Sequence, residues 1–181
     1  MKRLFSAMLC IAMLVVVSGC SSTPNFKKVY DQLNADGFKF DYSYVEMEEA
    51  KGNFYTLKVM PKDFSLKDSS YFYFNVSDYA DEALTDNIIA TIYHAHDGEI
   101  YGVNANVEQQ TMINGTCFVD YESMEPIKST VGKCNGEQIE KMKEHKETIQ
   151  KFLEQYGLAY DDLSAFYEWY ASEHADSVVK E

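Results

Sequence analysis

Hydrophobic residues first recur at helical spacing in the stretch that follows residue 24. Apolar or aromatic side chains stand three or four positions apart, at Phe26, Val29, Tyr30 and Leu33. This spacing gives a helix one apolar face, and it predicts a helix of about three turns. Thr23 is a suitable N-cap, Pro24 suits the first helical position, and Gly37 offers a left-handed exit.

After residue 37 the pattern changes to the two-residue alternation of β-strands. Residues 38–44 place aromatic side chains on one face, and residues 54–60 and 71–76 are two further apolar runs. Residues 87–96 are rich in residues that favour β-strands, and they predict a strand. Asp97-Gly98 then predicts a hairpin turn, followed by a strand at 99–107. A single helix over residues 78–96 is the competing interpretation. A second hairpin signal follows at Asn114-Gly115.

The C-terminal part of the chain returns to helical spacing. From Asn135 to Gly157 one stripe contains Ile139, Met142, Ile149, Phe152, Leu153 and Tyr156. Asp161 is a candidate N-cap for a final helix. In that helix Leu163, Phe166, Tyr167 and Tyr170 share one face. The two segments predict a helical hairpin, and residues 175–181 form a polar tail that we expect to fray.

Together these elements predict an α+β fold. We expect an antiparallel meander sheet of five to six strands, with an N-terminal helix and a C-terminal helical hairpin. One globular domain spans residues 25–174, since no repeat, low-complexity tract or interdomain linker interrupts it. In its element types the arrangement resembles the cystatin-like and NTF2-like sheet-plus-helix modules, a resemblance that implies no function.

The first twenty residues have a pattern of their own, which predicts a signal peptide. Lys2 and Arg3 precede an apolar run from Leu4 to Val17, which is too short for an ordinary membrane-spanning helix. The stretch Val-Ser-Gly-Cys that ends at Cys20 resembles the lipobox of bacterial lipoproteins. This resemblance implies that residues 1–19 are removed and that Cys20 carries fatty acyl chains such as palmitate. An uncleaved core helix and an ordinary secretory signal are the alternatives.

The lipobox resemblance also implies a location. Acyl chains on Cys20 would anchor the protein in the cell membrane, facing outside the cytoplasm, with residues 20–24 as the tether. The signal holds two basic residues and no acidic ones, so the mature chain has 14 basic against 29 acidic residues, a net charge of −15. Such a surface repels phosphate backbones, which excludes nucleic acid as a partner. The expected partners are the lipid bilayer and a protein, peptide or cell-envelope ligand.

Two cysteines are candidates for a disulfide once Cys20 is assigned to lipid and Cys10 to the signal. Cys117 and Cys134 are then an even pair, and an exported protein meets oxidising conditions. A bond between them closes a loop whose stabilising effect is roughly 3 kcal/mol. Two free thiols, or half of a metal site, are the alternatives, although the spacing matches no zinc motif and no histidine falls between them.

His94, His96 and Glu99 are candidate metal ligands near the predicted hairpin tip. With the turn at Asp97-Gly98, His96 lies opposite Glu99, and the two histidines share one face of their strand. Two imidazoles and a carboxylate are adequate ligands for zinc or copper. The alternative is a solvated tip with a His–Glu pair that stabilises the hairpin by at most about 1 kcal/mol.

The sequence contains no recognisable catalytic constellation and no cofactor motif. It has no Gly-x-Ser-x-Gly elbow and no glycine-rich phosphate loop. Tyrosines on the predicted strands offer a binding surface if no helix covers them, although we expect helices to cover most of them. The pattern therefore favours a non-catalytic binding or interaction module. A metal-handling lipoprotein and a hydrolase with an unrecognised site are the alternatives.

Overall fold

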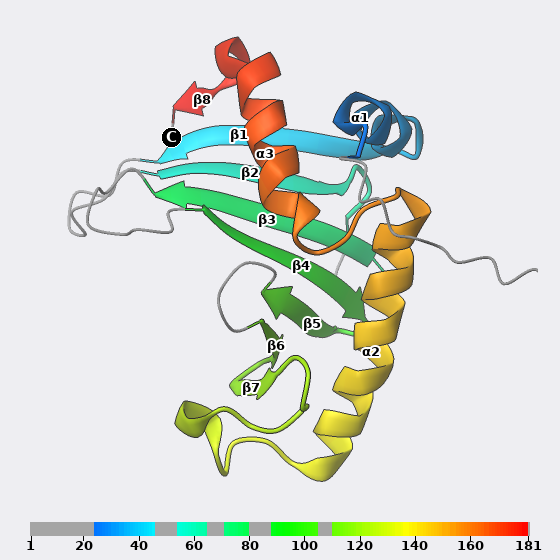
Figure 1. The fold of residues 1–181 in the computed structure, drawn as a ribbon, viewed down its shortest axis with the longest axis vertical. Coiled ribbons are helices and arrows are strands. Elements are labelled where there is room, and N and C mark those ends of the chain that lie inside the picture. Colours follow the sequence, from blue (N-terminus) through cyan, green and yellow to red (C-terminus); the bar gives the residue numbers. More distant parts are fainter. Residues whose placement is uncertain (1–23, 46–53, 65–70, 80–87, 105–109, 181) are drawn as a thin grey trace, which may run out of the picture.

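A computed structural model describes residues 24–45, 54–64, 71–79, 88–104 and 110–180. In this part of the chain one sheet contains eight strands in the order β7-β6-β5-β4-β3-β2-β1-β8 (Figure 1). The strands are β1 (Phe38–Val45), β2 (Phe54–Pro61), β3 (Tyr71–Tyr79), β4 (Ile88–His96), β5 (Glu99–Asn104), β6 (Thr111–Asn114), β7 (Cys117–Asp120) and β8 (Val179–Lys180). β1 to β7 pair antiparallel in chain order, and β8 pairs in parallel with β1. The α+β class is confirmed, and β1 to β7 form an antiparallel meander. The described sheet nevertheless has eight strands where five to six were predicted, and one of them, β8, joins it in parallel.

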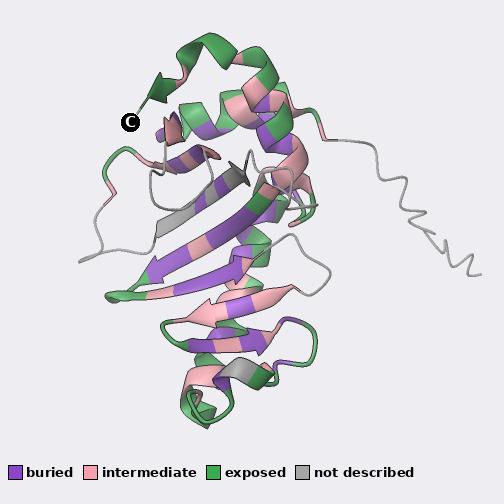
Figure 2. Cartoon of the chain, turned by 90° about the vertical axis from the view of Figure 1, so that its left-hand side faces the viewer, coloured by how far each residue is buried: buried purple, intermediate pink, exposed green. Residues whose placement is uncertain are grey.

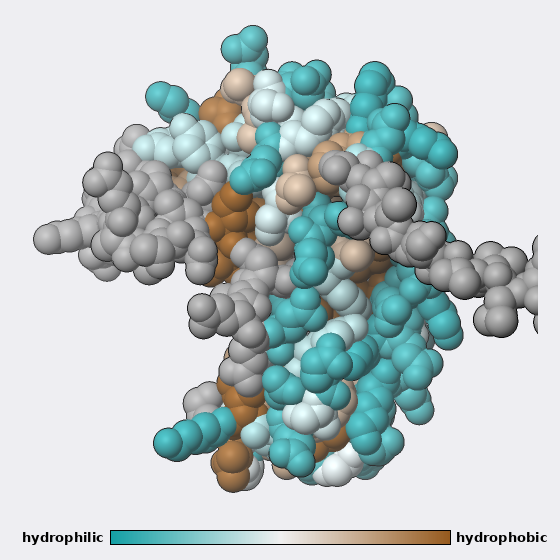
Figure 3. Space-filling view, viewed as in Figure 1, coloured by the Kyte–Doolittle hydropathy of each residue, from teal (hydrophilic) through white to brown (hydrophobic). Residues whose placement is uncertain are grey.

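Three α-helices cover one face of this sheet. They are α1 (Phe26–Ala35), α2 (Gly136–Gln155) and α3 (Asp162–Glu173). α1 lies against β1, α3 lies over β3 and β4, and α2 runs along β4, β5 and β6 (Figure 1). Hydrophilic side chains cover the outer surface of α2, as expected for a helix whose apolar stripe faces a sheet (Figure 3). None of the described helices has both the length and the apolar composition needed to span a membrane.

The core between the helices and the sheet is rich in aromatic rings. Phe166 of α3 is fully buried, and its ring centroid lies 5.8 Å from those of Phe26 and Phe74. Both predicted helical stripes are confirmed, because their central members are all buried: Met142, Ile149, Phe152, Leu153, Leu163, Phe166, Tyr167 and Tyr170. Figure 2 shows buried positions concentrated along the strands and exposed positions on the helices and turns.

The β4–β5 hairpin has the predicted register. β4 ends at His96 and β5 begins at Glu99, and these two residues pair across the turn. Asp97 and Gly98 have φ angles of 49° and 79°, the left-handed values that a type I′ turn requires at both central positions. Residues 88–96 therefore form a strand, and the competing helix over residues 78–96 is wrong.

The β6–β7 hairpin is displaced by one residue from its predicted position. The predicted turn residues were Asn114 and Gly115. In the structure Asn114 pairs with Cys117, so the two turn residues are Gly115 and Thr116. Gly115 takes the left-handed conformation, with a φ angle of 57°. A glycine is favoured there because other residues meet a steric penalty at positive φ.

Two helix caps differ from the prediction. The side chain of Asn25 accepts a hydrogen bond from the Lys28 backbone N–H, so Asn25 is the N-cap of α1, while Thr23 lies outside the described residues. At the start of α3, the Asp161 side chain makes no capping hydrogen bond. Instead, the Asp162 carboxylate accepts from the Ala159 backbone N–H. Several polar residues near a helix start can accept a hydrogen bond from the backbone, and sequence spacing alone does not choose among them.

The expectation that residues 175–181 form a frayed tail is wrong for residues 175–180. Ala175–Ser177 form a 3-10 turn, and β8 then pairs with Ser43 and Tyr44 of β1. This pairing covers part of the outer edge of β1 with a two-residue strand. Short edge strands of this kind limit further strand addition.

The opposite face of the sheet carries no α-helix in the part of the chain that the structure describes. Tyr93, Ile100, Ile113 and Phe118 point to this face and are half-buried. The ring of Tyr93 lies across Gly102, where an added Cβ would come within 2.9 Å of it. On the helix-covered face, by contrast, Tyr42 and Tyr101 are buried. The expectation that helices cover the strand tyrosines thus holds for some of them and not for Tyr93.

Candidate functional site

A polar groove between the β4–β5 hairpin and α2 is the candidate functional site. It is open to solvent and has a volume of about 610 Å³. We call it the histidine groove and define it by its lining residues, which are His94, His96, Asp97, Glu99, Tyr101, Lys141, Glu144, His145 and Thr148. Every second side chain of β4 and β5 faces α2, and these side chains line one side of the groove. The residues from α2 lie on successive turns of the helix.

Three histidine rings meet in this groove. His94 and His96 project from the same face of β4, with ring centroids 5.7 Å apart. His145 reaches them from α2, and its ring centroid lies 4.8 Å from that of His94 and 5.8 Å from that of His96. The Nδ1 atoms of His94 and His145 are 2.7 Å apart. A neutral imidazole has one donor and one acceptor nitrogen, so one proton serves this contact.

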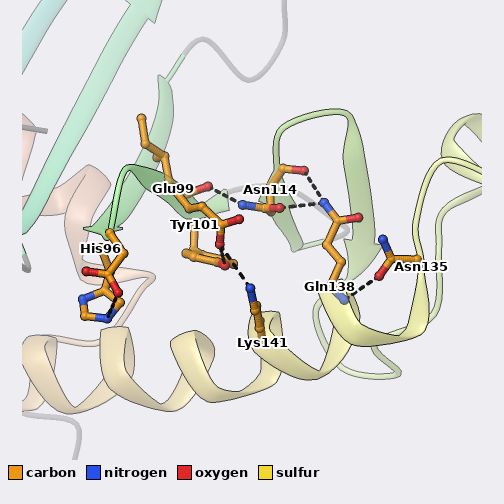
Figure 4. Close-up of polar contacts among 9 residues, drawn as sticks. His96, Glu99, Tyr101, Asn114, Asn135, Gln138 and Lys141 are labelled. Atoms are coloured by element: carbon orange, nitrogen blue, oxygen red, sulfur yellow. Dashed lines mark hydrogen bonds and ion pairs between the residues drawn. The ribbon is translucent and has the colours of Figure 1, made fainter. Parts of the chain in front are cut away.

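Tyr101 positions both His145 and Glu99. Its ring stacks on the His145 ring, with centroids 3.7 Å apart and planes inclined by 10°. Its hydroxyl donates a hydrogen bond to the Glu99 carboxylate, which also lies 3.8 Å from the ammonium group of Lys141 (Figure 4). The carboxylate of Glu99 is therefore directed toward Tyr101 and Lys141.

A hydrogen-bond network beside the groove holds the first turns of α2 on the sheet. The Gln138 amide donates to the backbone oxygen of Asn114 at 3.1 Å and to its side-chain oxygen at 2.6 Å (Figure 4). The Asn114 amide in turn donates to the Ile100 carbonyl, 3.0 Å away. Asn135 caps α2 by accepting from the Gln138 backbone N–H. These contacts fix the height of α2 relative to β5, and with it the position of His145.

Burial keeps the two inner histidines uncharged. Burial, followed by the neighbouring His145 and His96, lowers the pKa of His94 from 6.5 to about 4. Burial also lowers the pKa of His145, aided by His96 and opposed by Glu144 and Glu99. Both imidazoles are therefore neutral near pH 7, because an isolated histidine already titrates below that value.

We expect acid to destabilise the fold through His94. A histidine whose folded pKa lies below its unfolded value stabilises the folded state fully above about pH 6.5, and this stabilisation is lost as pH falls toward about 4. Because solvent in the groove partly screens the ring, the expected loss in the free energy of unfolding is on the order of 2 kcal/mol. Urea unfolding in metal-free buffer at pH 7.5 and 4.5 measures it. His94→Gln should reduce the pH dependence by that amount, and an unchanged dependence would contradict the assignment.

The structure brings His145 beside the predicted ligand candidates His94 and His96, and it directs the carboxylate of the third candidate, Glu99, toward Tyr101 and Lys141. His94 and His96 share a face, and Glu99 pairs opposite His96, as expected. No group of three or more His, Cys, Asp or Glu side chains in the described ranges could hold a metal ion in its present conformation. The Nε2 atom of His96 instead lies 3.4 Å from the Asp97 carboxylate. A ligand role for Glu99 stays a prediction.

His145 was missed in the sequence, although a signal for it exists. It lies three residues after Met142 and four before Ile149, two buried members of the apolar stripe of α2. A polar residue at such a position faces the sheet and needs a polar partner there. His94, which is 4 % exposed on the opposing strand, is that partner.

The disulfide predicted between Cys117 and Cys134 is present. The two Cα atoms are 4.9 Å apart across a sequence separation of 17 residues. Cys117 is fully buried at the start of β7, and its sulfur lies 3.8 Å from that of Met142 on α2. The bond therefore ties the loop before α2 to the edge of the sheet. Cys10 and Cys20 lie outside the described residues.

In two hollows of the described residues, a hydroxyl group and an ammonium group are held by other contacts. In the histidine groove, the hydroxyl of Thr148 donates to the Glu144 backbone oxygen at 2.9 Å. A second hollow of about 390 Å³ contains Lys146, whose ammonium group lies 3.8 Å from the ring centroid of Tyr121 and donates to its carbonyl. Activation of a nucleophile requires a positioned base beside it, and neither of these groups has that arrangement.

No protein-family model, no curated protein and no solved structure matches this chain.

Proposed function

We propose that this chain is a membrane-anchored extracytoplasmic lipoprotein and that its folded domain is a non-catalytic binding module. The sequence up to Cys20 supplies the anchor, because a signal peptide followed by Val-Ser-Gly-Cys is typical of diacylated lipoproteins. Two acyl chains on one residue hold a protein at a membrane far more stably than one chain does. The domain then lies outside the cytoplasm, within reach of envelope components.

The Cys117–Cys134 disulfide is the observation that carries this proposal. Structural disulfides persist in oxidising compartments and are rare in the reducing cytosol. Cα atoms 4.9 Å apart lie within the range that a disulfide needs. The bond leaves Cys20 as the cysteine of the mature chain that is free for acylation.

Two surfaces of the domain support a binding role. The histidine groove is open and polar, with titratable side chains from both β4 and α2. The sheet face opposite the helices presents half-buried Tyr93, Ile100, Ile113 and Phe118. Apolar patches with polar surroundings commonly mark sites of protein or ligand contact. These surfaces and the tether favour a binding role.

Cys20→Ala is expected to abolish lipid attachment. The wild-type protein, expressed in a bacterium and extracted with detergent, should begin at Cys20 and carry the added mass of its acyl chains. The variant should retain residues 1–19 and incorporate no labelled palmitate, because the acyl chains attach through the sulfur atom that alanine lacks. Intact-protein mass spectrometry and palmitate labelling measure the difference.

Cys10→Ala is the matched control, since it removes a cysteine from the apolar part of the same signal. It should leave both the acyl mass and the cleavage at Cys20 unchanged. A wild-type protein that begins at Met1 and carries no lipid would overturn the anchoring proposal. Equal loss of label in both variants would show that acylation does not depend on Cys20 in particular.

A further inference from the structure

We propose that His94, His96 and His145 form a binding site for one divalent transition-metal ion, Zn²⁺ or Cu²⁺, completed by rotation of the His96 side chain. This inference names the ligand class of the histidine groove, and so it rests on the binding role proposed above. The set differs from the one expected from sequence, because an imidazole from α2 takes the place of the Glu99 carboxylate.

The separations of the three rings fit a metal site. With metal–nitrogen bonds of about 2.0 Å and tetrahedral angles, imidazole centroids around one ion lie about 5 Å apart. The observed centroid separations are 4.8, 5.7 and 5.8 Å. The His94–His145 separation already matches this spacing, and the His96 ring lies less than about 1 Å beyond it before its side chain rotates.

Two of the three ligands already converge. The Nδ1 atoms of His94 and His145 face each other at 2.7 Å. Two nitrogens on one tetrahedral ion lie about 3.3 Å apart, so these rings need to separate by only several tenths of an ångström. The stacking of Tyr101 on His145 restricts the rotation of that ring.

The third ligand requires a change of side-chain conformation. The Nε2 atom of His96 lies 3.4 Å from the Asp97 carboxylate, and the His96 side chain is 47 % exposed. An exposed contact of this kind contributes little to stability, so releasing it costs little. In the present conformation, no group of three ligating side chains converges among the described residues, so the site requires His96 to rotate.

The charges around the rings favour a cation over an anion. Asp97, Glu99 and Glu144 line the groove, against the single ammonium group of Lys141. Imidazole ligands select zinc, copper or nickel, whereas calcium and magnesium prefer sites made of oxygen atoms. Because the groove is open on one side, a fourth position remains for water or for a ligand atom from a partner.

Metal titration of the full-length, untagged protein in detergent tests this site. We expect the wild type to bind about one Zn²⁺ or Cu²⁺ per chain in competition with a chromogenic chelator. His96→Gln and His145→Gln should each weaken binding at least tenfold, as loss of a direct ligand costs more than loss of an outer-sphere contact. His96 is exposed, so its variant tests the site even if His145→Gln fails to fold.

His174→Gln serves as the matched control, and Glu99→Gln tests the charge of the groove. His174→Gln removes the fourth histidine, which packs against Tyr170 with ring centroids 4.3 Å apart, well outside the groove lining. Its affinity should stay within twofold of the wild type. Glu99→Gln should weaken binding by less than the tenfold expected for a direct ligand, because its carboxylate adds negative charge to the groove but faces Tyr101 and Lys141. Electron paramagnetic resonance of the Cu²⁺ form should show nitrogen hyperfine structure that weakens in His145→Gln.

Three outcomes would overturn the inference. They are no binding by the wild type, an equal loss in His174→Gln, and a tenfold loss in Glu99→Gln together with none in His145→Gln. The N-terminal mass of the same preparation separates this inference from the anchoring proposal. An acylated protein that binds no metal overturns the metal site alone, and an unacylated protein that binds metal overturns the anchor alone.

Discussion

Phe166→Ala is expected to lower the free energy of unfolding by about 4 kcal/mol, the typical cost of truncating a fully buried phenylalanine. Phe166 has no solvent exposure and lies where α1, α3 and the sheet meet. Its ring contacts Phe26, Phe40, Phe74 and Trp169, with centroids 5.7 to 6.5 Å apart. Alanine would leave a cavity bordered by rigid rings, which cannot collapse to fill it.

Urea unfolding followed by circular dichroism measures this loss. Phe118→Ala is the matched control, because Phe118 is a half-buried phenylalanine on the opposite face of the sheet. We expect Phe118→Ala to lower the free energy of unfolding by only about 1 to 2 kcal/mol, because folding removes less apolar area of Phe118 than of Phe166 from water. If the two variants lose equal stability, the helix-covered face is not the main core of this fold.

Removal of the disulfide has the second-largest expected effect. Replacing Cys117 and Cys134 together by alanine should lower the free energy of unfolding by about 3 kcal/mol, because the unfolded chain regains the freedom of a closed loop of this length. The loss of the buried sulfur of Cys117, which contacts Met142, adds to it. The loop between β7 and α2 should open first, as the bond joins its two ends.

Reduction of the wild type provides the internal control for this prediction. A reductant should lower wild-type stability by a similar amount and should leave the double variant unchanged. Thiol titration of the denatured, unreduced mature protein should find no free thiol if Cys20 is acylated. Two titratable thiols, together with stability that is indifferent to reductant, would show that Cys117 and Cys134 are not joined.

Local patterns predicted most of the fold. The alternation of aromatic and polar residues in 38–44 requires a strand, and the Asp-Gly pair at Asp97-Gly98 selects one hairpin register. Each of these signals depends on a few neighbouring residues. The position of β8 could not be predicted in the same way. Its two residues carry no recognisable strand pattern, and they pair with β1, which lies more than a hundred residues earlier in the chain.

The candidate site was only half predictable for the same reason. His94 and His96 share a strand face because of a two-residue period, which is a local rule. The approach of His145 depends on how α2 lies across β4 and β5, and that is fixed by contacts such as Gln138 with Asn114. A histidine in an apolar stripe marks a need for a partner without identifying it. The Glu99 side chain points away from the two histidines of β4. Its carboxylate instead accepts a hydrogen bond from the hydroxyl of Tyr101, which lies two residues along the same strand face.

The short tether limits how far an acylated chain could hold its domain from the bilayer. Only four peptide units separate Cys20 from Pro24, and they span at most about 14 Å. The start of α1 would then lie within that distance of the lipid headgroups. α1 packs against β1, whereas β7, which carries the Cys117–Cys134 bond, lies at the other end of the strand order. The disulfide-bonded strand is therefore the strand most distant from the point at which the anchor joins the domain.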